Sequence, residues 1–110
     1  MVRIFAMRPN LRVAKSLVQF GAHLKAARLK RNLTQQLVAE RAGISEATLK
    51  KIEAGSAGVS VGNCAAVLFA LGFDVPFAEL ASPHKDSLGQ SLADMEMRKR
   101  ARPNSTLHDS

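Results

Sequence analysis

Aromatic residues and cysteine are scarce in this chain, and the scarcity limits the folds open to it. There is no tryptophan and no tyrosine, and the aromatic residues are five phenylalanines. Such a composition disfavours a β-sandwich and favours small helices built on Ala, Leu and Val. The single cysteine, Cys64, has no partner for an internal disulfide and no second thiolate for a metal site. We expect it to be a small core residue in a protein of a reducing compartment.

Long apolar runs and a signal-peptide core are also missing. No apolar stretch reaches the length that spans a membrane, and residues 1–9 lack the apolar centre of a leader. The sequence therefore predicts a cytoplasmic protein with no membrane partner.

Acidic residues are absent before Glu40, where eight basic residues occur. The whole chain has 16 basic and 9 acidic residues, a formal charge of +7. A field of this sign attracts polyanions, of which nucleic acid comes first and an anionic membrane second, although a solvated surface has the same composition. The eight residues are Arg3, Arg8, Arg12, Lys15, Lys25, Arg28, Lys30 and Arg31.

The order of apolar residues, caps and breakers predicts helices. An amphipathic helix begins near Pro9 or at Ser16, carries Val13, Leu17, Phe20, Leu24 and Ala27 on one face, and ends at Asn32. Three more follow, opened by Thr34, Ser45 and Ser60 and closed by Gly43, Gly55 and Gly72. We further expect a short fifth helix at residues 75–80 and a weak sixth one capped by Asp86. A disordered basic tail is expected from residue 98.

The second and third of these helices are joined by a very short step, Gly43-Ile44-Ser45. Glycine reaches positive φ at little cost, so the chain reverses sharply there. The following helix is then held steeply, with Ser45, Glu46, Ala47, Lys50 and Lys51 outward. A rigid helix about 10–12 Å across fits a DNA major groove about 12 Å wide. An ordinary corner between two bundle helices has the same local pattern.

The stretch LTQQLVAERAGISEATLKKIEAG, residues 33–55, resembles the Cro/C1-type (XRE) helix-turn-helix of phage repressors and bacterial regulators. The resemblance implies an all-α fold, a compact five-helix domain with flexible basic extensions at both ends. It implies a basic N-terminal arm or helix extension at residues 1–16 and a DNA-binding domain at residues 17–80. Its helix-turn-helix occupies residues 34–54, and a C-terminal extension occupies residues 81–110.

The resemblance also implies roles for individual residues. Gln35 matches a position that binds backbone phosphate, and Glu46, Ala47 and Lys51 match positions that read bases. Arg28 and Glu53 match a partly buried structural ion pair. The implied DNA-binding set is Thr34, Gln35, Gln36, Ser45, Glu46, Ala47, Thr48, Lys50 and Lys51.

The function expected from these features is sequence-specific binding of double-stranded DNA by a transcriptional regulator. We expect a repressor that acts as a homodimer on a palindromic operator in the bacterial cytoplasm, on the nucleoid. Val67, Phe69 and the face Leu88, Leu92 and Met95 are candidate dimer contacts. Three scattered histidines and no catalytic motif predict no enzyme activity, no metal and no cofactor.

Two other functions stay open. The arrangement of GVS before an apolar helix ending in VLFALG, with a basic C-terminal stretch, resembles antitoxins of the HipB type. That likeness implies a kinase-like toxin of the HipA type as partner and autoregulation of an operon. A basic helical binder of RNA or of anionic membrane is the third possibility.

Overall fold

The computed structural model describes residues 10–108, with side chains for residues 10–101, and in that part of the chain every regular element is a helix. The all-α prediction is therefore confirmed. The chain divides into two compact units, residues 1–75 and residues 76–110, and each is described by itself. No helix in the described part is both long and apolar enough to cross a membrane.

The described part of the first unit, from residue 10 on, contains four helices, α2 (Leu11–Lys30), α3 (Gln35–Ala42), α4 (Glu46–Glu53) and α5 (Val61–Ala70). Each begins at a residue whose side chain accepts a hydrogen bond from a backbone N–H three positions on, which satisfies one of the orphan donors of the first turn. The predicted starts at Thr34, Ser45 and Ser60 are confirmed. Helix α2 begins close to Pro9 rather than at Ser16, because Asn10 accepts from the N–H of Val13 at 2.9 Å.

The predicted helix ends are confirmed as well. Positive φ angles occur at Asn32 (55°), Gly43 (71°), Gly55 (84°) and Gly72 (92°). These are the residues that were expected to stop the four helices, since a left-handed residue turns the chain away from the helix axis.

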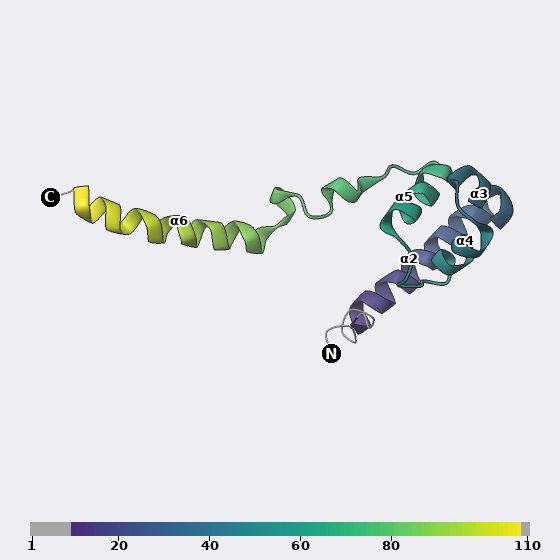
Figure 1. Ribbon diagram of the computed structural model, residues 1–110, viewed down its shortest axis with the longest axis horizontal. Helices are drawn as coiled ribbons and strands as arrows, with labels where there is room; N and C mark the ends of the chain where they lie inside the picture. Colours follow the sequence, from purple (N-terminus) through teal and green to yellow (C-terminus); the bar gives the residue numbers. More distant parts are fainter. Residues whose placement is uncertain (1–9, 109–110) are drawn as a thin grey trace. The chain divides into compact units, whose positions relative to one another are not determined.

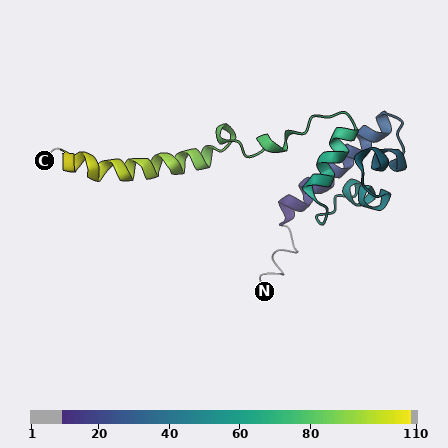
Figure 2. The ribbon, with the colours of Figure 1, turned by 45° about the horizontal axis from the view of Figure 1, so that its top comes forward.

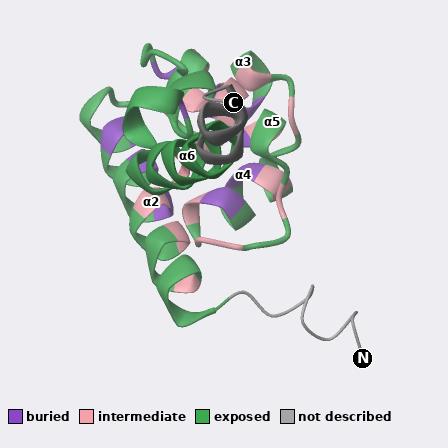
Figure 3. Ribbon diagram, turned by 90° about the vertical axis from the view of Figure 1, so that its left-hand side faces the viewer, coloured by how far each residue is buried: buried purple, intermediate pink, exposed green. Residues whose placement is uncertain are grey.

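The core of the first unit lies where α3 packs on α4 and α5 and where α2 packs on α4. Figure 3 colours the buried residues of these helices purple. The buried apolar residues of this unit are Leu24, Ala27, Val38, Ala39, Leu49, Ile52, Cys64, Val67 and Leu71. Cys64 is thus a core residue as expected, and burial raises the pKa of its thiol, which favours the protonated form.

Helix α2 is longer than the core that it covers. In Figures 1 and 2 its first turns extend beyond the other helices of the unit. Val13 was expected to face inward but is exposed, because none of the other helices from residue 10 on reaches that end of α2. Leu17 and Phe20 are half-buried, and full burial begins only at Gly21 and Leu24.

Two glycines set how closely α2 approaches the end of α4. A Cβ added to Gly21 would lie 2.6 Å from the carbonyl oxygen of Glu53 and would also meet that of Ile52. On the other side, a Cβ on Gly55 would lie 2.5 Å from the Cα of Val18. The two backbones are therefore in direct contact, a distance that only a residue without a side chain permits.

The second unit consists of two short 3-10 helices, η1 (Pro76–Glu79) and η2 (Pro83–Lys85), and the long helix α6 (Ser87–His108). The expected short fifth helix corresponds to η1. Asp86 caps α6 as predicted, accepting from the N–H of Gly89 at 2.9 Å. Between Ser87 and Ala101 every side chain of α6 is exposed except at Gly89, which is half-buried.

The expectation of a disordered tail from residue 98 is wrong, because α6 continues to His108. The residues from Met95 to Ala101 are Met, Glu, Met, Arg, Lys, Arg and Ala, all strong helix formers. Glu96 and Arg100, one turn apart, also form an ion pair at 3.7 Å. The basic arm expected at the N-terminus, with Arg3 and Arg8, lies outside the described residues.

The close contact at Gly21 predicts opposite effects for one substitution at two helical glycines. Gly21→Ala should lower the free energy of unfolding by about 1–3 kcal/mol, because a methyl group must push the Ile52–Glu53 backbone away. Gly62→Ala in α5 meets nothing closer than the Ser60 hydroxyl at 3.9 Å and should raise it by about 0.5–1 kcal/mol. Urea titration followed by circular dichroism measures both. Equal effects of the two variants would contradict the backbone contact.

Candidate nucleic-acid interface

The helix-turn-helix is built around the turn at Gly43. The N–H of Gly43 donates to the carbonyl of Glu40 at 3.2 Å, and the N–H of Ile44 donates to that of Ala39 at 3.0 Å. These bonds use carbonyls that α3 leaves unpaired at its end. Ser45 then has extended backbone (φ −75°, ψ 154°) and begins α4 immediately. Only three residues separate the two helices, so their crossing has little freedom.

Helix α4 has a buried face and an exposed face. Leu49 and Ile52 are buried against α2 and α3. The exposed positions on the helix and at its start are Ser45, Glu46, Ala47, Lys50 and Lys51. The outward set predicted for this helix is therefore the set that the structure exposes, and each of its side chains is either short or polar.

Thr48 and Ser45 contribute mainly to the start of α4. The Ser45 hydroxyl donates to the Thr48 hydroxyl at 2.8 Å and accepts from the Thr48 N–H at 3.0 Å. Thr48 is half-buried, so its side chain is less accessible to a ligand than those of its neighbours. On the outer surface, Lys50 lies 3.8 Å from Glu46, one turn earlier. Both are exposed, so this pair adds little stability and leaves Lys50 able to reorient.

A charged network joins α2 to α3 and α4. The Nε of Arg28 donates to one carboxylate oxygen of Glu53 at 2.7 Å, and its Nη2 donates to the other at 3.1 Å. The third nitrogen, Nη1, donates to the carbonyl of Leu33 at 3.0 Å. The two side chains are only 8% and 5% exposed. The ion pair implied by the resemblance is therefore present, and it is bidentate.

Gln35 belongs to the same network, which sequence reasoning missed. Its amide nitrogen donates to Glu53 at 3.0 Å, onto the carboxylate oxygen that also accepts from Arg28. The side chain is thereby fixed at the first turn of α3, with its amide oxygen and second N–H uncommitted in this network. Thr34 and Gln36 on either side are exposed. Thr34 accepts from the N–H of Leu37 at 3.1 Å and so also serves as the cap of α3.

A second contact had no local sequence signal. The guanidinium of Arg31 lies 5.1 Å from the ring centre of Phe73, and its Nη1 donates to the carbonyl of Ala27 at 2.9 Å. It ties the end of α2 to the segment after α5. In the described part of the chain, no group of three or more His, Cys, Asp and Glu side chains is placed to hold a metal ion.

A family model described as a helix-turn-helix domain matches residues 19–80, more than half of the chain. The chain belongs to this family. It is a helix-turn-helix domain of the Cro/C1 type, and this identifies residues 19–80 as a DNA-binding domain of the kind found in transcription regulators. No curated protein matches the chain at a significant level.

The network predicts a large loss of stability when one partner is removed. Arg28→Ala leaves the Glu53 carboxylate buried without its cation and should cost about 3–5 kcal/mol. Arg12→Ala removes an exposed arginine from the same helix and should leave the unfolding midpoint nearly unchanged. Thermal unfolding of the two variants beside the parent chain is the measurement. Equal midpoints for the two variants would show that the bridge does not hold α4.

Proposed function

We propose that this protein is a sequence-specific transcriptional repressor that binds double-stranded DNA as a homodimer on a palindromic operator. The observation that carries the proposal is the exposed face of α4, whose side chains are short or polar, on a helix whose other face and C-terminal end are fixed to α2 and α3. Such a helix can enter a major groove with polar side chains toward the bases and without a cost for ordering the backbone.

Readout and positioning fall to different residues in this proposal. Lys51 donates to guanine O6 or N7, Glu46 accepts from cytosine N4, and Ala47 contacts a thymine methyl group. Gln35 and Thr34 contact phosphates at the N-terminus of α3, where the helix dipole also attracts an anion. Gln36, Ser45, Thr48 and Lys50 lie at the edges of the same surface, with Thr48 the least accessible of them.

A homodimer follows from the size of the reading surface. One α4 helix covers too few base pairs for useful specificity, and two-fold dimers read two half-sites one helical turn apart. The cationic N-terminal half of the chain adds sequence-independent attraction to phosphates. The protein then acts in the cytoplasm, with no catalysis and no cofactor, bound to the nucleoid through its operator.

Selection of bound sequences from random duplex DNA tests the proposal. A palindromic consensus is the expected result. Lys51→Ala should weaken operator binding by about 1–3 kcal/mol and relax the preference at one base pair per half-site. Gln35→Ala should weaken all sequences nearly equally, because phosphates carry no base code.

Two controls accompany these variants. Lys30→Ala removes the same charge from α2 and should leave the consensus unchanged. Because Gln35 also bonds to Glu53, thermal unfolding must show that Gln35→Ala is folded at the assay temperature. Identical selectivity profiles for Lys51→Ala and Gln35→Ala would refute this division of roles, and a parent chain that selects no consensus would refute sequence-specific repression.

The exposed face of α6 favours a second candidate, an antitoxin that binds a kinase-like toxin and regulates its own operon. Leu88, Leu92 and Met95 recur at helical spacing and are 69%, 55% and 55% exposed. An amphipathic helix of this kind suits an apolar groove on a protein partner.

Co-purification from the native cell tests the second candidate. We expect a kinase-like protein to be recovered with the chain, and Leu92→Glu to abolish its recovery while DNA binding is retained. Met97→Glu, at an apolar position on another side of α6 that is 68% exposed, is the matched control. Repeated recovery of the chain without any kinase would exclude the antitoxin function and leave the repressor.

A further inference from the structure

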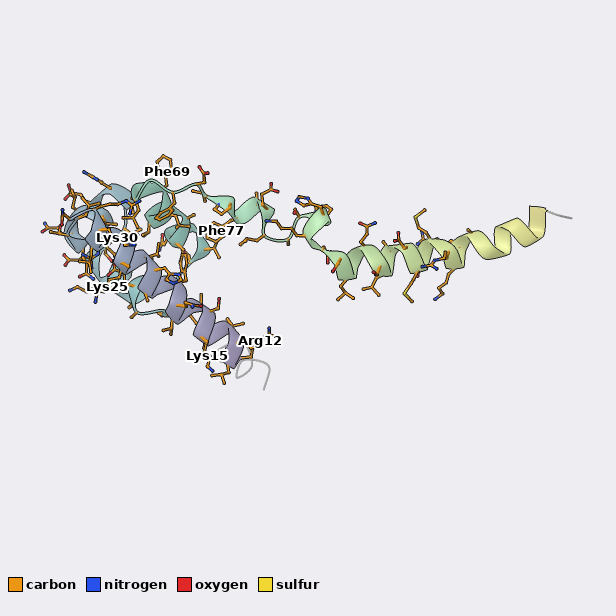
Figure 4. The ribbon with its side chains drawn as sticks, turned by 180° about the vertical axis from the view of Figure 1, so that it is seen from behind. Arg12, Lys15, Lys25, Lys30, Phe69 and Phe77 are labelled. Carbon is orange, nitrogen blue, oxygen red and sulfur yellow. The ribbon has the colours of Figure 1, made fainter. Side chains whose placement is uncertain are left out.

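Helix α5 has an apolar face that no described residue of the first unit covers. Cys64, Val67 and Leu71 face α3 and are buried. On the other side, Val61 is 63% exposed and Phe69 is 75% exposed. Figure 4 shows Phe69 pointing away from the helices of its unit. Beyond the helix end, Phe73 and Val75 are also exposed, at 42% and 41%. Val67, expected as a dimer contact, is only 1% exposed, so that prediction is wrong; of the expected contacts in the first unit, Phe69 is the exposed one.

This face differs from the others in its charge. Helix α5, VGNCAAVLFA, contains no charged residue. Helix α2 carries exposed cations along its length, among them Arg12, Lys15, Lys25 and Lys30, which Figure 4 shows. The outer face of α4 carries Lys50 and Lys51. Two copies that met through α2 or α4 would bring like charges together, whereas two copies that met through α5 would not.

We propose that the exposed face of α5 is the surface on which a second copy of this chain docks, which names the interface of the homodimer and rests on the proposed function. The spacing suits a two-fold antiparallel pair. Val61 and Phe69 lie four residues, about one helical turn, on either side of Ala65. A two-fold axis that passes at Ala65 therefore places Phe69 of each copy over Val61 of the other. This is the self-complementary pattern that a two-fold interface requires.

The position of α5 leaves the DNA-reading surface free. Helix α5 packs on α3, and α4 packs on α3 and α2. A second copy on the outer side of α5 therefore covers none of Glu46, Ala47 and Lys51. Both α4 helices remain available to one duplex, as a dimer on a two-fold operator needs.

The size of the face sets the strength of the dimer. Ten residues of helix extend for about 15 Å, and a standard interface buries about 800 Å² on each partner. The α5 face with Phe73 and Val75 lies below that standard. The interface therefore predicts a dimer that dissociates on dilution and that a palindromic operator strengthens by binding both copies at once.

Sedimentation velocity over a concentration series tests the interface. The parent chain should shift from dimer to monomer on dilution, and Phe69→Glu should be monomeric throughout, because pairing would bury a carboxylate. Leu29→Glu, which places the same charge at a 53% exposed apolar position of α2, should dimerise as the parent does. Phe69 is largely exposed, so its replacement leaves the core intact.

A disulfide test gives the geometry. In a Cys64→Ala background, Ala65→Cys should form a disulfide-linked dimer on mild oxidation, and Ala26→Cys on the exposed side of α2 should not. A dimer that persists in Phe69→Glu, or cross-links through residue 26 instead, overturns this interface and leaves the homodimer standing. A parent chain that is monomeric at every concentration, with and without operator DNA, overturns the interface and the homodimeric repressor together.

Discussion

The bidentate contact between Arg28 and Glu53 is the interaction on which the rest of the helix-turn-helix domain depends. One guanidinium bonds to the last residue of α4 and to the carbonyl of Leu33, which precedes the start of α3. Gln35 closes the network from the first turn of α3. Three helices that are separate in sequence are thereby joined at one buried point. Both charged groups are almost completely removed from water, so loss of either partner would leave the other buried and unpaired. The network therefore fixes one arrangement of the three helices even where its net contribution to the free energy of unfolding is small.

Rigidity of α4 cannot come from α4 itself. Eight residues are too few for an isolated helix to be stable in water. The free-energy cost of nucleating the helix exceeds the gain from the hydrogen bonds of two turns. Its order comes instead from three contacts at different points along it: Ser45 at the start, Leu49 and Ile52 along the inner side, and Glu53 at the end. The glycine contact of α2 with the Ile52–Glu53 backbone fixes the same end sterically. Apart from Ser45, the residues of the outer face take no part in these contacts, so their identity is not constrained by the stability of the helix.

The parts of the structure that sequence predicted are those with local causes. A hydroxyl three residues before an N–H, or a glycine at the end of an apolar repeat, carries its own explanation, and Thr34, Ser45, Ser60 and Gly43 all behaved as expected. The failures concern events at a distance. The exposure of Val13 depends on where other helices stop, and the burial of Val67 depends on α3. The contact of Arg31 with Phe73 joins residues 42 positions apart and leaves no trace in either neighbourhood. The helical tail is a different case, because its cause is local. Residues 95–101 are strong helix formers, although their basic charge is also typical of a disordered tail.

Helices α2 and α4 of the first unit contribute to DNA binding in different ways. The cations of α2 and the absence of any acid before Glu40 create a long-range attraction that brings a polyanion to the domain but does not choose its sequence. In the proposed complex, α4 selects the sequence, and the phosphates that the cations attract repel Glu46. A carboxylate near phosphates costs binding energy unless it accepts a hydrogen bond, so Glu46 penalises every site that offers it no donor. Salt weakens the first effect more than the second, because hydrogen bonds at base edges are not screened as phosphate contacts are. The ratio of operator to random binding should therefore rise as ionic strength increases, even as both affinities fall.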